Sequence, residues 1–592
     1  MEGLDRRTFL AGLTGGLVGA GLAAPMRVLT ASAIQAGKVS AARGCGLEIA
    51  APFVVSDPAL GLSTELLLTA ANFPGSQGFR DAQYGTEYEV MLYDAAGREV
   101  SLDGSRKQVI SAMRPTIIDM DQVLDGKPFW GSARLKLTPR GENASHSSDL
   151  FSAGFVRWHS AHNFDNVHAH PIAPDDQRGR FFYSMPFPAL DEYHCALALF
   201  NPNDDESAGV VRVVDRLGRT VGERRYRLGP RQSTLYSLSD MKPAASPGEA
   251  LAPAAPDAAL RAGGVVAVIN DSEAISYGYT FIKGRAGGSF SVEHPLHFQD
   301  VAVKPARPSP FGPAGNFTAD ALLFTPMLFA GCRIGGVALE SRVHLSASQW
   351  LEEALWLMPF AAGARGNIDW KSDDDPQVLQ RVRPAELVDQ GVVRLGPFQS
   401  CVIDAARLPL PAGYSGGFGV ATVPRTSHSL LKIEVRAKEW GRVCFTHFRP
   451  GGASHKRYQL VTGRGGLASD YIVSGCQVRG SAADRRYDCV LAVMNIGLGD
   501  NLTGAPRIQL FSDHGLVGEK LLGDFPELAC RHYLLSELFP ELQTEPDHPL
   551  TARLVEDTAP MIMSALHLDY ERRDIAMDHG SDRHSTYLDY DC

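Results

Sequence analysis

The chain lacks a cluster of basic residues outside its N-terminus. Its 592 residues include 57 Lys and Arg against 67 Asp and Glu, which gives a formal net charge of -10. Because binding to a phosphate backbone requires gathered positive charge, this balance argues against nucleic acid as a partner. Beyond the N-terminus no run approaches 18 consecutive apolar residues, so we expect no transmembrane segment in the mature chain.

The sequence also lacks short motifs that identify several enzyme classes. It has no phosphate-binding P-loop, no G-x-G-x-x-G dinucleotide fingerprint and no H-E-x-x-H zinc-protease motif. Its 9 cysteines form no C-x-x-C pair, and their spacing assigns no pairing. We expect mostly buried structural cysteines, with one or two disulfides if the protein is exported.

The N-terminus carries the most specific signal in the chain. Residues 4–10 read Leu-Asp-Arg-Arg-Thr-Phe-Leu, followed by a short glycine-rich apolar run over residues 11–24 and by the small-residue site Ala31-Ser32-Ala33. This segment resembles the bacterial twin-arginine (Tat) signal, in which two arginines and Phe-Leu precede a weakly apolar stretch. The resemblance implies that residues 1–33 are a signal peptide and that the folded protein is exported to the periplasm or cell exterior.

Two short motifs recur along the chain and indicate an internal repeat. Asp94-x-x-Gly97-Arg98 and Asp215-x-x-Gly218-Arg219 both predict a hairpin, because Asp accepts backbone hydrogen bonds at the start of a tight turn and Gly supplies a positive φ. Residues 228–233 read LGPRQS and residues 395–400 read LGPFQS. A later hairpin, with Ser512 in place of Asp, predicts a further copy, so we expect about four related modules.

These repeats, with 59 Gly and 37 Pro between short apolar runs, predict a mainly β chain. The expected architecture is a tandem series of antiparallel β-sandwich-like modules with short helical turns, and it resembles immunoglobulin or fibronectin-like sandwiches. A single helix is predicted over residues 347–357, where apolar residues lie at helical spacing. We expect the following organisation: a β module at 34–180, a second at 181–298, a Pro-rich linker at 299–318, a third module with the helical insertion at 319–480, and a fourth at 481–592.

The one dense group of chemically versatile residues lies near the end of the first module. Four of the 18 histidines fall there within twelve residues, namely His159, His162, His168 and His170. In a strand, His168 and His170 project from the same face, which lets two imidazoles bind one metal ion. His159 or His162 across the hairpin, together with Asp165, could complete a site for a transition metal such as Zn, Cu, Fe or Mn.

The repeat offers a competing explanation for these histidines. His170 and His294 each follow a glycine by sixteen residues, and His455 and His584 are looser equivalents. A histidine at the same place in each module can hydrogen-bond a neighbouring backbone or lie at a module interface. If the modules pack around a common axis, such histidines converge.

Composition and motifs favour a non-enzymatic exported protein that acts in binding, scaffolding or envelope assembly, with an envelope protein or a glycan as candidate partner. The alternative is a metal-binding protein or metal-dependent enzyme that uses the histidines at 159–170. A carbohydrate-active or carbohydrate-binding protein is a third hypothesis. It lacks an identifiable pair of catalytic carboxylates, and its candidate stacking residues serve equally well in a core: Trp130, Trp350, Trp370 and Trp440.

Overall fold

In its described residues the protein is built of antiparallel β-sheets, and the helical turns there are 3 or 4 residues long. The prediction of a mainly β chain made of sandwich-like modules is therefore confirmed. Within the described part of the chain, no helix is long and apolar enough to cross a membrane. The computed structural model describes residues 47–59, 61–70, 85–102, 107–111, 113–140, 152–160, 164–168, 170–171, 181–241, 260, 263–285, 290–294, 299–300, 322–347, 353–361, 392–408, 410–423, 431–450, 469–481, 483–496, 503–544 and 548–582.

The second module shows the basic unit. It contains a 5-stranded sheet in the order β14-β13-β16-β11-β19 and a 4-stranded sheet in the order β15-β12-β17-β18. Its elements are β11 (Phe181–Phe187), β12 (Tyr193–Phe200), β13 (Ser207–Asp215), β14 (Thr220–Leu228), β15 (Ser233–Ser237), η4 (Leu238–Asp240), β16 (Gly264–Asn270), β17 (Tyr277–Gly284), β18 (Phe290–Glu293) and β19 (Gln299–Asp300).

The fourth module repeats this unit strand for strand, with sheet orders β32-β31-β34-β29-β37 and β33-β30-β35-β36. Because β29 pairs with β34 and β37, this module includes residues that precede the boundary expected at 480. Its elements are β29 (Ser469–Cys476), β30 (Tyr487–Asn495), β31 (Arg507–Ser512), β32 (Gly515–Leu521), β33 (Cys530–Leu534), α6 (Leu535–Leu538), β34 (Leu550–Glu556), β35 (Met561–Asp569), β36 (Asp574–His579) and β37 (Ser581–Asp582).

The first module has the same two strand sets, joined into one sheet where β1 pairs with β2. One set is β4-β3-β7-β1-β10 and the other is β6-β2-β8-β9, with β5 added beside β3. Its elements are β1 (Leu47–Asp57), β2 (Leu62–Ala70), β3 (Gly85–Asp94), β4 (Glu99–Val100), β5 (Lys107–Ser111), β6 (Pro115–Asp119), α2 (Met120–Val123), β7 (Phe129–Arg140), β8 (Ser152–His159), β9 (Phe164–His168) and β10 (His170–Pro171).

The third module follows the same plan, with its two strand sets joined where β20 pairs with β21. The sets are β23-β22-β25-β20-β28 and β24-β21-β26-β27. Its elements are β20 (Leu322–Ile334), β21 (Val337–Ser346), β22 (Glu353–Ala361), β23 (Val392–Leu395), β24 (Ser400–Asp404), η6 (Ala405–Arg407), β25 (Tyr414–Val423), β26 (Leu431–Ala437), β27 (Arg442–His447) and β28 (Arg449–Pro450).

The helix predicted at 347–357 is wrong. Residues 348–352 lie outside the described part, but β22 is a strand that pairs with β25 from Ala354↔Val423 to Ala361↔Gly416 and with β23 on its other edge. A short apolar run is compatible with either a buried helix or an interior strand, and periodicity alone does not separate them. Hydrogen bonding to two neighbouring strands decides the conformation here.

The two sequence motifs fold as predicted and also join one module to the next. Gly97 and Gly218 have φ of 83° and 81°, in the left-handed region that favours glycine. A Cβ added to Gly97 in the first module would lie 2.3 Å from the carbonyl oxygen of Pro230 in the second. One added to Gly218 in the second module would lie 2.4 Å from the carbonyl oxygen of Pro397 in the third. Each Asp-x-x-Gly turn therefore docks on the Leu-Gly-Pro-x-Gln-Ser turn of the following module.

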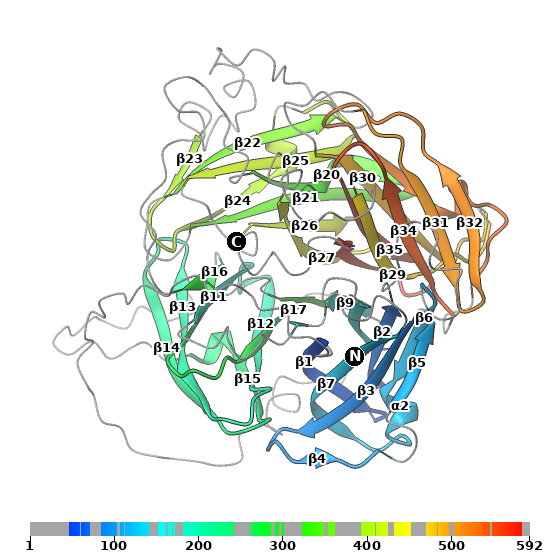
Figure 1. The fold of residues 1–592 in the computed structure, drawn as a ribbon. Coiled ribbons are helices and arrows are strands. Elements are labelled where there is room, and N and C mark those ends of the chain that lie inside the picture. Colours follow the sequence, from blue (N-terminus) through cyan, green and yellow to red (C-terminus); the bar gives the residue numbers. More distant parts are fainter. Residues whose placement is uncertain are drawn as a thin grey trace.

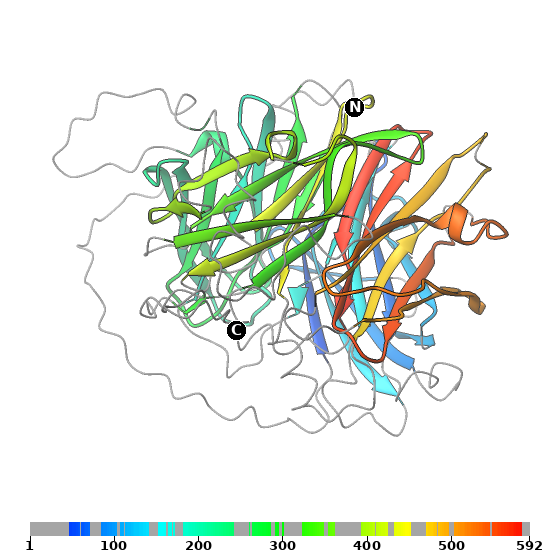
Figure 2. The same ribbon diagram turned by 90° about the horizontal axis from the view of Figure 1, so that it is seen from above.

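The four modules form a closed ring. Figure 1 shows the blue, cyan-green, yellow-green and orange-red groups of strands placed around a common centre. In each interface the first strand of one module contacts the 4-stranded set of the next: β1 meets β12, β11 meets β21, and β20 meets β30. The ring closes where β29 of the fourth module contacts β2 and β8 of the first, which Figure 2 shows as the orange-red and blue groups side by side.

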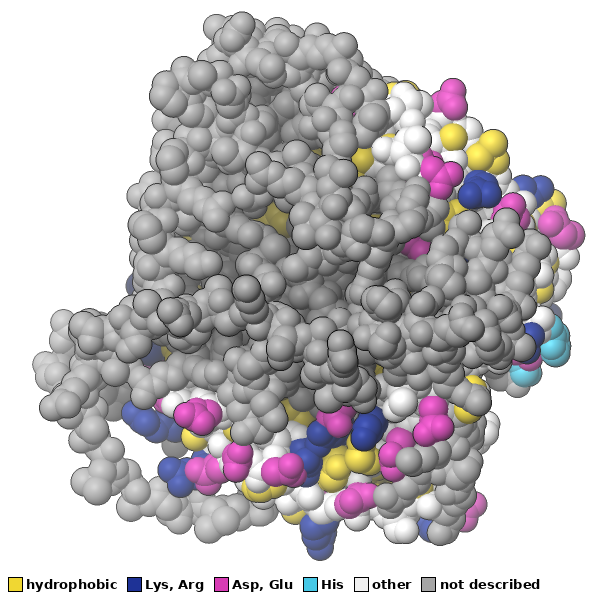
Figure 3. Space-filling model, in the orientation of Figure 1, with side chains coloured by type: hydrophobic (Ala, Val, Ile, Leu, Met, Phe, Trp, Pro, Cys, Tyr) yellow, Lys and Arg dark blue, Asp and Glu magenta, His cyan; other side chains and the backbone are white. Residues whose placement is uncertain are grey.

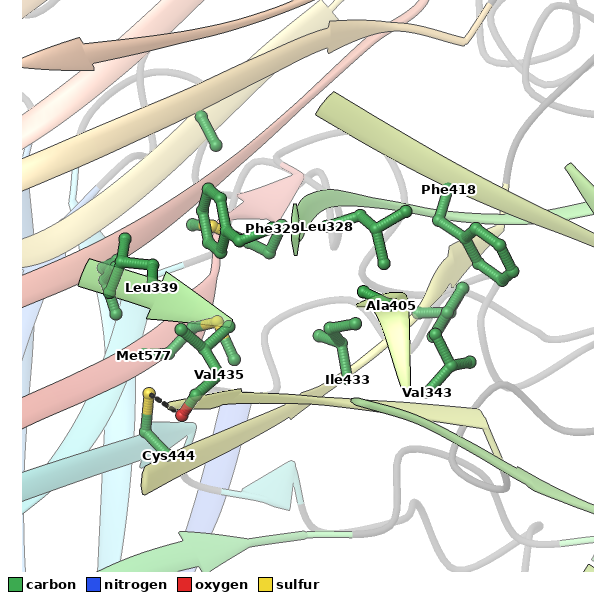
Figure 4. Packing of buried hydrophobic residues seen from close by; sticks show 14 of the residues in the cluster. Leu328, Phe329, Leu339, Val343, Ala405, Phe418, Ile433, Val435, Cys444 and Met577 are labelled. Atoms are coloured by element: carbon green, nitrogen blue, oxygen red, sulfur yellow. Dashed lines mark hydrogen bonds between the residues drawn. The ribbon is translucent and has the colours of Figure 1, made fainter. Parts of the chain in front are cut away.

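The hydrophobic cores also cross module boundaries. One cluster contains most of the buried residues of the third module together with residues of the fourth, including Met577 on β36. Figure 4 shows Met577 beside Val435 and Leu339 of the third module, with Cys444 nearby. Burial of apolar surface therefore holds the ring together as well as each sandwich. The described cysteines are free thiols, and Cys45 and Cys592 lie outside the described residues.

Candidate metal centre

The last strand of each 4-stranded set, here called the closing strand, lies at the centre of the ring. The closing strands are β9, β18, β27 and β36, one from each module. β9 contacts β18 and β36, and β27 contacts the same two strands. The four closing strands therefore form a continuous circuit, so that residues at matching positions in different modules meet.

Three histidines meet at this centre. His294 immediately follows β18, His447 ends β27 and His579 ends β36, and all three are buried. One ring nitrogen from each lies within 4.8 Å of the others. The ring centroids are 4.0 Å apart for His447 and His579, 5.2 Å for His294 and His447, and 6.1 Å for His294 and His579. We call these three residues the central histidine cluster.

The strand register explains why these histidines coincide. Each 4-stranded set starts after a residue with positive φ, and these residues are Met113, Arg231, Phe398 and Leu528. In each module, the fourth residue after this positive-φ residue lies in the edge strand of the set. It is the first of a row of cross-strand partners, one on each strand, that ends on the closing strand. The rows are Ile117–Leu67–Phe155–His168, Leu235–Ala198–Tyr279–His294, Val402–His344–Lys432–His447 and His532–Ala492–Ser564–His579.

The same row position therefore carries histidine in every module. In the second module the row ends one residue beyond the last recorded pair, Thr280↔Glu293, so His294 falls opposite Tyr279. Residue 168 occupies the matching position of β9 in the first module. The repeat places one histidine per module at the same level of the ring.

A hydrogen bond to the backbone orients the imidazole of His579. Nδ1 of His579 lies 3.0 Å from the carbonyl oxygen of Gly580. Because a carbonyl only accepts hydrogen bonds, Nδ1 carries the proton and donates it, so that Nε2 is the unprotonated nitrogen of the neutral ring. A hydrogen bond of this kind is the usual way in which a metal-binding histidine is oriented.

The environment of the cluster carries both acidic and basic groups. Lys432 Nζ lies 2.5 Å from Glu293 Oε2, and that oxygen lies 3.8 Å from His447 Nδ1. Burial raises the pKa of Glu293 to about 7, although Lys432 opposes the shift and Asp578 adds to it. Burial also lowers the pKa of Lys432. Asp578 Oδ1 is 3.9 Å from His579 Nε2, so the carboxylates outnumber the ammonium group beside the histidines.

Hydrogen bonds between closing strands hold the histidines in register. Asp165 Oδ2 on β9 accepts a 2.6 Å hydrogen bond from the backbone N of Val292 on β18. Ser291 Oγ on β18 accepts one of 3.2 Å from the backbone N of Phe445 on β27. Asp165 is fully buried, so its bond joins the first and second modules away from competing water.

The structure describes the backbone of three of the four histidines that the sequence singles out for a metal site. His159 Nε2 lies 3.5 Å from Glu65 Oε1, at the other end of the β8–β9 hairpin from His168. Four residues of strand separate their levels, which is about 13 Å. His170 lies on β10, paired with Ala50, and so belongs to the other strand set. His162 lies outside the described residues.

The strand register aligns the modules differently from the sequence interval. It matched His170 with His294, whereas the register matches His168 with His294. The looser equivalents at 455 and 584 lie outside the described residues, and the row positions belong to His447 and His579. In the first, third and fourth modules, this histidine stands two residues before the last short strand of the module, which is β10, β28 or β37. A search at that position would have found the three histidines, but these short strands could be located only once the structure was known.

One enzyme-like motif is present but lies in the wrong structural context. Gly413-Tyr414-Ser415-Gly416-Gly417 matches G-x-S-x-G, the pattern of the nucleophile elbow. Such a serine sits on a sharp turn from strand to helix, whereas Ser415 lies within β25, paired with Phe329 of β20. The motif therefore gives no support for a serine hydrolase.

Two of the tryptophans considered for carbohydrate stacking fall in described regions. The ring of Trp440 in the third module makes an edge contact with Tyr570 of the fourth, at 5.4 Å between centroids. Trp130 packs against the core of the first module. Both contribute to packing within the ring, and Trp350 and Trp370 lie outside the described residues.

Comparison of the chain with protein-family models and with curated proteins finds no match.

Proposed function

We propose that this chain is an exported protein that binds one transition-metal ion at the central histidine cluster. The observation that carries the proposal is the convergence of His294, His447 and His579, three buried imidazoles from three modules. Three histidines suit zinc, copper, iron or another late first-row ion, for which imidazole is a preferred ligand.

The dimensions of the cluster support the proposal. An ion with bonds of about 2.1 Å to three nitrogens holds those nitrogens about 3.4 Å apart. The ligand atoms already lie within 4.8 Å of one another, so the widest pair needs to approach by at most about 1.4 Å. The neighbouring carboxylates of Glu293 and Asp578 favour a cation at this place over an anion.

A metal ion here would join modules that are far apart in the sequence. Its ligands come from residues 294, 447 and 579, so one ion would cross-link the second, third and fourth modules. A ligand bound only by the folded state stabilises it in proportion to the logarithm of its concentration over Kd. The expected role of the ion is therefore to fix the ring, and the rigid ring then serves the binding or scaffolding role in the cell envelope.

The outer surface supports a protein partner or a glycan better than nucleic acid. On the face in Figure 3, the Lys, Arg, Asp and Glu side chains of the described residues are interspersed along the lower edge rather than separated by sign. Export through the Tat route, which moves folded proteins, suits a chain that acquires its ion before it leaves the cytoplasm.

The test is metal analysis of the full chain, purified without a histidine tag. We expect one equivalent of a transition metal per chain, and a rise in the thermal unfolding temperature of the chelator-treated protein when that ion is returned. His447→Gln and His579→Gln should each reduce the bound metal to well below one equivalent.

His514→Gln is the matched control, because His514 belongs to the same module as His579 but its side chain is 89% exposed. This variant should retain the ion. Wild-type protein that carries no metal, and gains no thermal stability from zinc, copper, iron or manganese, would overturn the proposal.

A further inference from the structure

The first module has a closing strand at the same place in the ring as the other three. β9 pairs with β8 as β27 pairs with β26 and as β36 pairs with β35. Within this pairing His168 is opposite Phe155, as His447 is opposite Lys432. Its backbone therefore occupies the row position that carries the cluster histidine in each other module.

The position of β9 in the ring is fixed independently of that register. β9 contacts β18, which leads to His294, and β36, which ends at His579. The hydrogen bond from Val292 N to Asp165 Oδ2 ties β9 to β18 three residues before residue 168. The gap in the circuit between the second and fourth modules is thus filled by the strand that ends at His168.

We propose that His168 belongs to the same metal centre as the central histidine cluster, so that each of the four modules contributes one imidazole. This inference rests on the proposed function and adds its fourth ligand. It also separates His168 from His159 and His170, with which the sequence had grouped it.

A fourth imidazole changes what the centre can do. Structural zinc sites have four protein ligands in a tetrahedral arrangement, whereas catalytic zinc sites keep one position open for water. With His168 included, a tetrahedral ion is fully ligated by protein. The centre then acts as a clamp across all four modules rather than as a source of metal-bound hydroxide.

The decisive experiment compares His168→Gln with His170→Gln in the full chain. His170 lies two residues beyond His168 and serves as the control. The equivalent strand position holds Arg449 in the third module and Ser581 in the fourth, so it is not a repeated histidine. Metal affinity is measured by competition with a chelator, and the coordination number by the visible absorption of the Co²⁺-substituted protein. We expect His168→Gln to weaken binding by more than about tenfold, the lower end of what loss of an outer-shell partner costs. It should also change the Co²⁺ spectrum, and His170→Gln should leave both unchanged.

A second variant covers the case in which His168→Gln does not fold. His168→Cys replaces the imidazole with a thiolate ligand, which gives an intense near-ultraviolet charge-transfer band with Co²⁺ only if residue 168 binds the ion. The band would support the proposal. A Co²⁺-loaded His168→Cys protein without the band, or a His168→Gln protein with wild-type affinity and spectrum, would overturn it. Wild-type protein that carries no metal and gains no thermal stability from added metal ions would instead overturn the proposed function itself.

Discussion

Lys432 Nζ lies 2.5 Å from Glu293 Oε2, and both side chains are buried beside the central histidine cluster. Lys432 comes from the third module and Glu293 from the second. Removing one member of a buried ion pair leaves an uncompensated charge in a medium of low polarity, which is strongly destabilising. The pair therefore links the stability of the ring to the electrostatics of the candidate metal centre.

Lys432→Met should lower the free energy of unfolding by about 3–5 kcal/mol. The measurement is denaturant unfolding in the presence of a chelator, so that metal binding does not contribute. Lys438→Met is the matched control, because Lys438 makes a surface pair of 2.9 Å with Glu340 and should cost about 1 kcal/mol or less. Equal costs for the two variants would contradict the prediction.

Removing the charge of Lys432 and removing the charge of Glu293 should change the metal affinity of the cluster in opposite directions. Lys432→Met removes a positive charge near the cluster and should tighten metal binding, whereas Glu293→Gln removes a negative charge and should weaken it. A change of about tenfold in each direction is expected from partners outside the ligand shell. Competition with a chelator at constant ionic strength measures both. Shifts of the same sign in the two variants would show that folding defects, not charge, dominate.

Gly218→Ala should disturb the joint between the second and third modules. The new Cβ would lie 2.4 Å from the carbonyl oxygen of Pro397, so the turns must separate. Gly441→Ala is the control, since Gly441 has φ of 65° but no heavy atom within 4 Å of the position that its new Cβ would take. Both substitutions introduce left-handed strain of about 1–2 kcal/mol. Gly218→Ala should cost about 1–3 kcal/mol more, through overpacking, in the free energy of unfolding.

Stability should fall in mild acid because of His567. Burial lowers the pKa of His567 to about 3, and the nearby Arg157 adds to the effect. Since the folded-state pKa lies below the unfolded value of about 6.5, the unfolded chain binds the proton first. The stabilising contribution is complete above about pH 6.5 and is lost as the pH falls from there toward 3.

The loss from His567 between pH 7 and pH 5 should be about 2 kcal/mol. His567→Gln should flatten that part of the pH profile by the same amount, as measured by denaturant unfolding at each pH. His514→Gln provides the comparison, because the side chain of His514 is 89% exposed rather than buried. A His567→Gln profile parallel to wild type would contradict the assignment.

The hairpin turns of the repeats could be predicted from the sequence. Asp215, Gly218 and their partners form a tight turn through contacts within five residues, so composition and spacing are enough to predict it. The alternation of short strands and turns likewise predicted a mainly β chain. The same motifs did not reveal that Gly218 docks on the turn of the next module, since that contact joins residues far apart in the chain.

Two further features were decided by tertiary structure. Residues 353–361 form a strand because β23 and β25 supply hydrogen-bond partners on both edges, which outweighs apolar spacing of helical type. The convergence of His294, His447 and His579 depends on contacts between β18, β27 and β36, which come from three different modules. The sequence alone does not show that one histidine per module occupies the same row, because the hairpin that ends at His168 is two residues shorter than the hairpin that ends at His294. The number of residues between the preceding glycine and the histidine therefore differs between the two modules. The sequence by itself determined the modules and their turns, whereas non-local strand pairing and ring closure determined which residues meet at the centre.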